Sequence, residues 1–138
     1  MSNEAANVAI LREAYARWHD SKGASDDWMA MVADDIKFGS LAEGAPQLAF
    51  AKRYSSRLAL EAYFAGLRAE WDMLHYTAHE FVAQGDMVFV RASTAWRHKR
   101  TGKSFDTPKA DFWRFRDGKI VEFYEYYDTA KVLDAASL

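Results

Sequence analysis

Two carboxylates stand at positions of the sequence where an apolar side chain would be expected. Residues 110–128 read ADFWRFRDGKIVEFYEYYD, which predicts two strands joined by a turn at Asp117-Gly118. Side chains alternate between the two faces of a strand, and this places Asp111 and Glu125 on the more apolar faces. A buried carboxylate must find a donor or take up a proton. Either residue could therefore be a general acid, a hydrogen-bond donor or a general base.

Alternation and helical spacing bring further residues to the same interior. The inward face of the strand expected over residues 87–98 ends at His98, and one stripe of the first helix carries Tyr15. We expect Asp111 to act with Tyr15 as proton donor or oxyanion partner. Glu125 would serve as base or water activator, and His98 as a polar gate. The walls of the substrate pocket are expected to be aromatic: Trp18, Trp96, Trp113, Phe123 and Tyr127.

Each of these assignments has a structural alternative. Asp111 could pair with a core tyrosine, with His98 or with an arginine, and a β-bulge could turn Glu125 outward. Tyr15 could be an ordinary core residue of an amphipathic helix. His98 could be exposed at the end of a hairpin. The aromatic residues could be walls and nothing more.

The elements that must position these residues come in a simple order, with helices before a run of strands. Such an order predicts an α+β fold, here as one domain over residues 1–138. Three N-terminal helices would pack on a curved, mostly antiparallel sheet and form a cone with an apolar interior and one open end. The expected helices are 8–18, 26–32 and one from 56, with a terminal helix at 129–138; the expected strands are 36–38, 75–83, 87–98, 105–115 and 119–127.

The composition excludes several classes of function. The chain has no cysteine, which rules out thiol nucleophiles, thiolate zinc sites and disulfides. Its 18 basic and 20 acidic residues give a net charge of −2, and the short basic cluster 97–100 is interpreted as a solvated hairpin end, so we expect no nucleic-acid partner. No apolar stretch approaches the ~20 residues that span a membrane. We expect a cytoplasmic protein without a membrane partner.

Motifs for metals, nucleotides and nucleophilic serine are missing from the sequence. His75 and His79 have the i, i+4 spacing of a helical chelate, but on a strand that spacing separates them by ~13 Å. The sequence contains neither a Gly-rich phosphate loop nor a GxSxG motif. We therefore expect no metal site and no cofactor.

Four motifs in order resemble the NTF2-like superfamily, and within it the SnoaL-like and ketosteroid-isomerase-related domains. They are AYARW at 14–18, a helix end at Ala33-Asp34-Asp35, a turn at Gln84-Gly85-Asp86 and the block FWRFRDGKIVEFYEYYD at 112–128. The order covers nearly the whole chain. The resemblance implies a cone-shaped fold, a pocket for a small apolar ligand and homodimers formed across the open face of the sheet.

The resemblance also suggests roles for individual residues. Tyr15 and Asp111 match the oxyanion-hole tyrosine and aspartic acid of ketosteroid isomerases, whose aspartate base falls near Ser40 here. A serine cannot act as that base. In SnoaL-type polyketide cyclases an acid in the pocket transfers a proton, which Asp111 or Glu125 could do.

A second enzyme class matches a different part of the same site. Glu125 matches a catalytic aspartate of limonene-epoxide hydrolases, which resemble this fold. The arginine-aspartate pair of those enzymes falls near Arg91 and Ser93, and alternation points Arg91 outward.

Taken together, these patterns predict a cofactor-free acid/base enzyme of isomerase, cyclase or hydrolase type. Its substrate would be an apolar molecule that bears a carbonyl or epoxide-like group. The alternative is a non-catalytic ligand-binding or dimerisation module. Two inward acids favour the enzyme, and the missing base at Ser40 favours the module.

Overall fold

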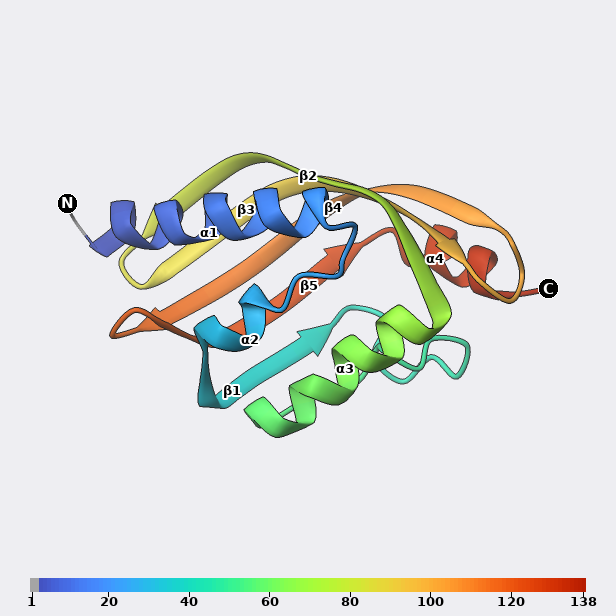
Figure 1. Ribbon diagram of the computed structural model, residues 1–138, viewed down its shortest axis with the longest axis horizontal. Coiled ribbons are helices and arrows are strands. Elements are labelled where there is room, and N and C mark those ends of the chain that lie inside the picture. The colour runs from blue at the N-terminus through green and yellow to red at the C-terminus, as the bar shows by residue number, and fades with distance from the viewer. Residues whose placement is uncertain (1–2) are drawn as a thin grey trace.

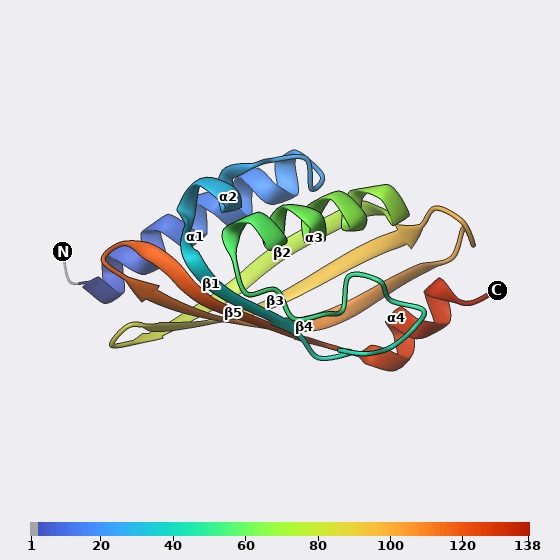
Figure 2. The same ribbon diagram turned by 90° about the horizontal axis from the view of Figure 1, so that it is seen from below.

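The computed structural model describes residues 3–138, and residues 1 and 2 of the expected domain lie outside the described residues. The chain folds as α+β, with helices α1, α2 and α3 on one face of a five-stranded sheet and α4 at one end (Figures 1 and 2). The elements are α1 Asn3–Asp20, α2 Asp27–Met31, β1 Val32–Ser40, α3 Arg57–Glu70, β2 Trp71–Gln84, β3 Met87–His98, β4 Ser104–Arg116, β5 Lys119–Tyr127 and α4 Thr129–Ala136.

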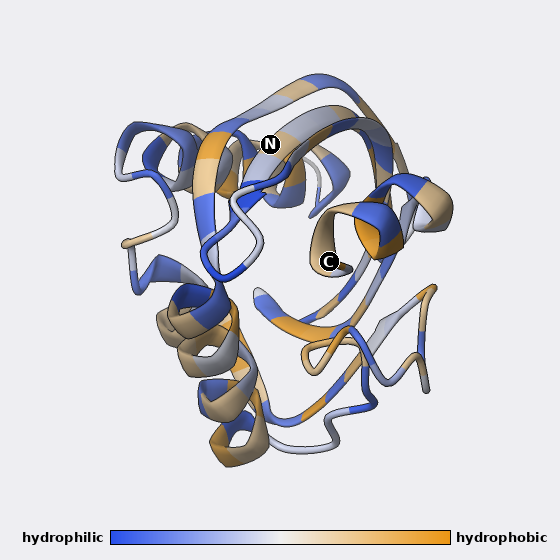
Figure 3. Ribbon diagram, turned by 90° about the vertical axis from the view of Figure 1, so that its right-hand side faces the viewer, coloured by the Kyte–Doolittle hydropathy of each residue, from blue (hydrophilic) through white to orange (hydrophobic). Residues whose placement is uncertain are grey.

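The strands follow the order β1-β5-β4-β3-β2 across the sheet. β1 runs parallel to β5, and the other neighbouring pairs are antiparallel. Figure 3 looks at the molecule from the end at which α4 lies and shows the sheet curving around an interior. The fully buried aliphatic side chains come from α1, α3, α4, the strands and the loop after β1, and they include Leu11, Ile36, Leu48, Leu60, Val90, Ile120 and Val132.

Local sequence signals explain where the elements begin and turn. Ser56 caps α3, because its hydroxyl accepts a 3.0 Å hydrogen bond from the Ala59 backbone N–H. Asp128 caps α4 in the same way through Lys131. Between β4 and β5 the φ angles of Asp117 and Gly118 are 50° and 77°. A two-residue hairpin turn needs such positive φ values, which Asp-Gly adopts readily.

The predicted architecture is confirmed, with β3 and β5 at their expected bounds and the C-terminal helix as a fourth helix. Two segments differ from the prediction in the type of element they form. Val32 and the segment Ala33-Asp34-Asp35 belong to β1, whose register shifts between Val32 and Lys37, and not to the end of a helix. Trp71 continues the 3.6-residue period of α3, but its φ and ψ are extended and it begins β2. Periodicity alone cannot separate a helix end from a strand that starts at the next residue.

Within the described residues, α1 and the other helices all lack the length or the apolar character that crossing a membrane requires.

Candidate active site

The inner faces of β4 and β5 bring the two carboxylates of the sequence together. Alternation places Asp111 and Glu125 on inward faces as predicted, and the ladder pairs them directly. Both lie in the wall of one cavity, together with Tyr15, Trp18, Trp96, Trp113, Phe123 and Tyr127. Its volume is about 80 Å³. This is below the ~300–1,000 Å³ that is typical of small-molecule sites, so the cavity suits a small ligand.

Asp111 is completely buried and surrounded by donors. Its Oδ2 accepts hydrogen bonds from the hydroxyls of Tyr15 at 2.6 Å and Tyr76 at 2.5 Å. Its Oδ1 lies 3.0 Å from the ammonium of Lys109, although it accepts no hydrogen bond. In these contacts Asp111 is a hydrogen-bond acceptor, whereas the sequence predicted a proton donor or an oxyanion partner. Its partnership with Tyr15 is present, with the tyrosine as the donor.

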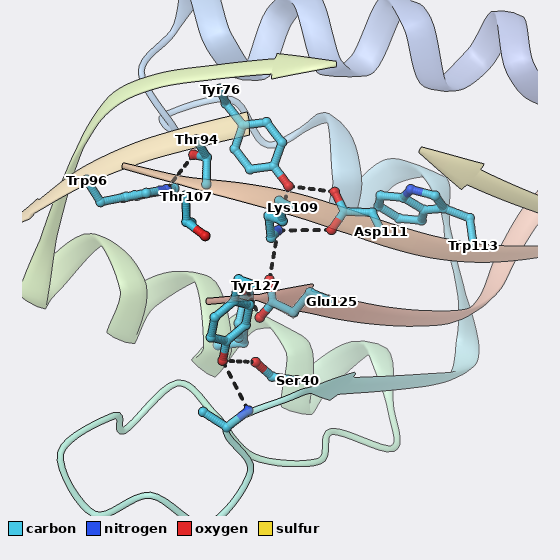
Figure 4. A network of polar contacts seen from close by, with 12 residues as sticks. Ser40, Tyr76, Thr94, Trp96, Thr107, Lys109, Asp111, Trp113, Glu125 and Tyr127 are labelled. Atoms are coloured by element: carbon cyan, nitrogen blue, oxygen red, sulfur yellow. Dashed lines mark hydrogen bonds and ion pairs between the residues drawn. The ribbon is translucent and has the colours of Figure 1, made fainter. Parts of the chain in front are cut away.

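Lys109 is a site residue that was not predicted from the sequence. Its side chain is only 8% exposed, and its Nζ lies 3.0 Å from Asp111 Oδ1 and 2.9 Å from Glu125 Oε1. It also donates a hydrogen bond to the Tyr76 hydroxyl (Figure 4). Burial lowers the pKa of Lys109, but Asp111 and Glu125 outweigh this effect and leave the pKa raised. The ammonium therefore stays charged at neutral pH.

The sequence did contain a signal for this lysine. Lys109 stands two residues before Asp111, so alternation puts both on one face. Lysine is almost never fully buried unless it is paired. A lysine on the apolar face beside an inward acid therefore predicts a buried ion pair.

Glu125 has fewer partners than Asp111. Its Oε1 contacts Lys109, and its Oε2 receives only a long contact of 3.4 Å from the Tyr63 hydroxyl. The β4–β5 ladder keeps it inward, because the register shift in that ladder lies beyond it, between Arg114 and Phe115. Glu125 therefore has more free acceptor capacity for a proton or a ligand than Asp111, which receives two short hydrogen bonds and the contact with Lys109.

The tyrosines of the site are neutral hydrogen-bond donors. Burial and then the nearby carboxylates raise the pKa of Tyr15, Tyr63 and Tyr76 well above the ordinary value of 10.0. Burial, followed by Glu125, raises the pKa of Tyr127 to about 12. Negative charge in the cavity is thus confined to the two carboxylates.

Ser40 stands where the resemblance to ketosteroid isomerases would place a base. It is fully buried at the end of β1, and its Oγ lies 2.6 Å from the Tyr127 hydroxyl. This hydrogen bond fixes a wall of the cavity. It gives no proton acceptor comparable to a carboxylate.

The expected aromatic walls all line the cavity, and two of their indole N–H groups donate hydrogen bonds within the protein. Trp113 Nε1 donates to the Tyr15 hydroxyl at 2.9 Å, and Trp96 Nε1 donates to Thr94 Oγ1 at 2.7 Å. Trp113 also stacks on Trp28, with ring centroids 4.8 Å apart. These contacts hold the rings rigidly around the charged centre.

His98 points inward but does not line the cavity. Its Nδ1 accepts the backbone N–H groups of Arg100 and Thr101, which organises the turn between β3 and β4. Its ring also lies against Trp71, with centroids 4.6 Å apart. This position suits a structural role in the turn more than the expected role of polar gate.

Arg91 and Ser93, the positions near which the arginine-aspartate pair of limonene-epoxide hydrolases would fall, lie on the outer face of β3. Arg91 pairs there with Glu80 at 2.6 Å, and Ser93 contacts His79. The cation-carboxylate pair that faces the cavity lies on the neighbouring strand β4 and consists of Lys109 and Asp111. His75 and His79 are separate on β2, and in the described part of the chain no three side chains gather as metal ligands.

Comparison with known proteins places this geometry in a wider group. A family model described as "SnoaL-like domain" matches residues 11–123. No curated protein matches. An NTF2-like protein from Burkholderia thailandensis has a similar structure, with a TM-score of 0.80 and 28% identity over 96% of this chain and 98% of that chain.

Two further similar structures share less sequence. One is a protein with a ketosteroid isomerase-like fold from Catenulispora acidiphila, in complex with trimethylamine, at 22% identity, a TM-score of 0.74 and coverage of 94% and 92%. The other is a candidate SnoaL-like polyketide cyclase from Jannaschia sp., at 18% identity, a TM-score of 0.76 and coverage of 99% and 96%.

Proposed function

The chain belongs to the SnoaL-like domain family, and we propose that it is a cofactor-free acid/base enzyme for a small apolar molecule that bears a carbonyl group. One observation carries this proposal. The Lys109 ammonium lies 3.0 Å from Asp111 and 2.9 Å from Glu125, inside a cavity whose walls are mostly aromatic. Charged groups held in such a water-poor site interact strongly with charge that develops in a reaction.

Glu125 is the proposed general base. It would take a proton from the carbon next to the carbonyl, and the C–H electron pair would form the enolate. Lys109 lies beside Glu125 and would stabilise the negative charge that develops on the oxygen. In a conjugated substrate, return of the proton from Glu125 to the far carbon of the dienolate completes an isomerisation. In a cyclisation the enolate attacks a second carbonyl, and the alkoxide that forms takes the proton back from Glu125. Asp111 is proposed as the anchor of Lys109.

Epoxide hydrolysis is a second candidate, and the presence of two carboxylates on one cation favours it. Glu125 would take a proton from a water molecule, whose oxygen attacks one carbon of the epoxide. The C–O bond breaks, the released oxygen takes a proton from Lys109, and Lys109 recovers a proton from Glu125, which lies 2.9 Å away. Both reactions use Glu125 as base, so the substrate distinguishes them.

The non-catalytic alternative rests on the close packing of the cavity. The tyrosine hydroxyls and two of the indole N–H groups already have partners within the protein. A small ligand could bind there without reacting. The trimethylamine complex of the Catenulispora protein is consistent with such a role.

A homodimer is part of the proposal, and the outer face of the sheet supports it. Val82, Phe89, Phe112 and Tyr124 are paired in register across β2, β3, β4 and β5 on that face. Phe89 is 47% exposed and Val82 is 67% exposed. An apolar stripe of this kind is a common mark of an interface between chains.

A ligand screen followed by product analysis tests the proposed function. Thermal-shift measurements with steroids, phenolic polyketides, epoxides and lactones would identify binders. Each binder is then incubated with the wild type and with Glu125→Gln. We expect product from the wild type and none from the variant, although the variant still binds. Binding without any product from the wild type would support the module.

A further inference from the structure

The charges that line the cavity do not balance. Among the described lining residues the charged side chains are Lys109, Asp111 and Glu125. Two carboxylates face one ammonium, which leaves one negative charge in excess. The tyrosines around them are neutral because their pKa values are raised.

This excess charge is almost completely removed from water. The side chain of Asp111 is 0% exposed, and that of Glu125 is 4% exposed. Burial of a charge is unfavourable unless a partner compensates it. Asp111 Oδ1 in addition accepts no hydrogen bond, although it lies 3.0 Å from Lys109. The site therefore keeps acceptor capacity for a donor that carries positive charge.

The walls of the cavity are also suited to a cation. Trp18, Trp28 and Phe64 form an edge-to-face cluster, with centroids 6.2 Å apart for the two tryptophans and 5.7 Å apart for Trp18 and Phe64. Aromatic faces attract ammonium groups. The protein already shows this attraction, since Lys109 Nζ lies 4.7 Å from the centroid of the Tyr76 ring.

We propose that the ligand of this cavity carries a protonated amine next to a small apolar body. Its ammonium would neutralise the excess charge at Glu125 and Asp111, and its apolar body would lie against the aromatic walls. As a statement about the substrate, this inference rests on the proposed function and makes the substrate an amine-bearing carbonyl compound. As a statement about binding, it is independent of turnover.

Three probes of one size and different charge test the inference. Isothermal titration calorimetry at pH 7 compares benzylammonium, benzyl alcohol and benzoate. We expect benzylammonium to bind at least tenfold more tightly than benzyl alcohol, and benzoate to bind most weakly. Equal or tighter binding of benzyl alcohol or benzoate would overturn the inference, and so would the absence of binding by all three probes.

Two variants locate the effect. Glu125→Gln removes the excess charge, so the preference for benzylammonium over benzyl alcohol should fall several-fold. Glu122→Gln makes the same change on the outer face of β5, where Glu122 pairs with Arg114, and should leave the preference unchanged. If Glu125→Gln does not fold, Trp28→Leu replaces it and should weaken benzylammonium more than benzyl alcohol. An unchanged preference in the folded variant contradicts the inference.

The results separate this inference from the proposed function. If the wild type turned over neutral ketones but did not prefer benzylammonium to benzyl alcohol, the inference alone would be contradicted. A clear charge preference without any turnover would contradict the proposed function alone.

Discussion

Lys109 and Asp111 stand two residues apart on β4 and point into the same cavity, with 3.0 Å between Nζ and Oδ1. Lys109 also contacts Glu125 on β5, and Asp111 accepts a hydrogen bond from Tyr15 on α1. Polar contacts of the site therefore join the first helix to the last strand. Asp111 is completely buried and has three polar partners, Tyr15, Tyr76 and Lys109, which identifies it as the anchor of the site.

Replacement of Asp111 by asparagine should destabilise the fold strongly. The variant leaves the buried Lys109 ammonium with Glu125 as its remaining carboxylate, and loss of one partner of a buried pair costs about 3–5 kcal/mol. Urea unfolding of Asp111→Asn measures the change in the free energy of unfolding. Asp106→Asn is the control, because Asp106 is exposed on the outer face of β4. A loss below about 1 kcal/mol would contradict the anchoring role.

Tyr15→Phe tests the donor side of the same anchor. It removes a hydrogen bond to a charged group and leaves Trp113 Nε1 without its acceptor. We expect a loss of about 1.5–3 kcal/mol, measured by urea unfolding. Tyr126→Phe should be nearly neutral, because Tyr126 is 42% exposed. Equal stability of the two variants would show that the Tyr15 contact is unimportant.

High pH should unfold the protein, because its buried tyrosines must then ionise. The folded pKa values of Tyr15, Tyr63 and Tyr76 are raised, mainly by burial. The folded state then holds these protons more tightly than the unfolded state. Their contribution to stability is complete below the unfolded pKa of about 10 and is lost as the pH rises through the folded values. The raised pKa of Lys109 acts in the same direction.

Absorbance at 295 nm and far-UV circular dichroism measure this titration together. We expect Tyr15, Tyr63 and Tyr76 to ionise only as the circular dichroism signal is lost. Ionisation of all seven tyrosines near pH 10 in the folded protein would contradict the burial of the site.

A charge at Phe89 should separate the proposed homodimer. Phe89 lies 5.0 Å from Phe112 on the outer face of the sheet, measured between ring centroids. We expect the wild type to sediment as a dimer and Phe89→Glu to sediment as a monomer. Leu58→Glu introduces the same charge on α3, where Leu58 is 76% exposed, and should leave the dimer intact. If the wild type sedimented as a monomer at high concentration, the proposed homodimer would be contradicted.

Alternation along the strands predicted the geometry of the site better than it predicted the chemistry. It placed Asp111 and Glu125 on inner faces, and the ladder pairs them. It could also have identified Lys109, but a lysine is ordinarily assigned to the solvent side. The partners of His98 could not be predicted, because they are backbone N–H groups of a turn. The pattern of side chains along a strand does not determine the geometry of such a turn.

The bounds of β1 show a second limit of the sequence. Asp34 and Asp35 suited the end of a helix, yet they lie in an irregular part of β1, where Asp35 pairs with Arg116. A strand that joins an existing sheet edge depends on pairing with a distant segment, here β5. Local sequence contains little information about such pairing.

The most direct test of the central claim is to measure whether Glu125 catalyses proton exchange in a ketone. Small cyclic and aryl ketones are incubated with the protein in D2O, and deuterium at the carbon next to the carbonyl is followed by NMR. We expect the wild type and Glu122→Gln to accelerate exchange. The rate with Glu125→Gln should be lower than that of the wild type by a factor of at least about 100. Exchange no faster than in buffer, or equal rates for Glu125→Gln and the wild type, would contradict the claim that this cavity performs base catalysis.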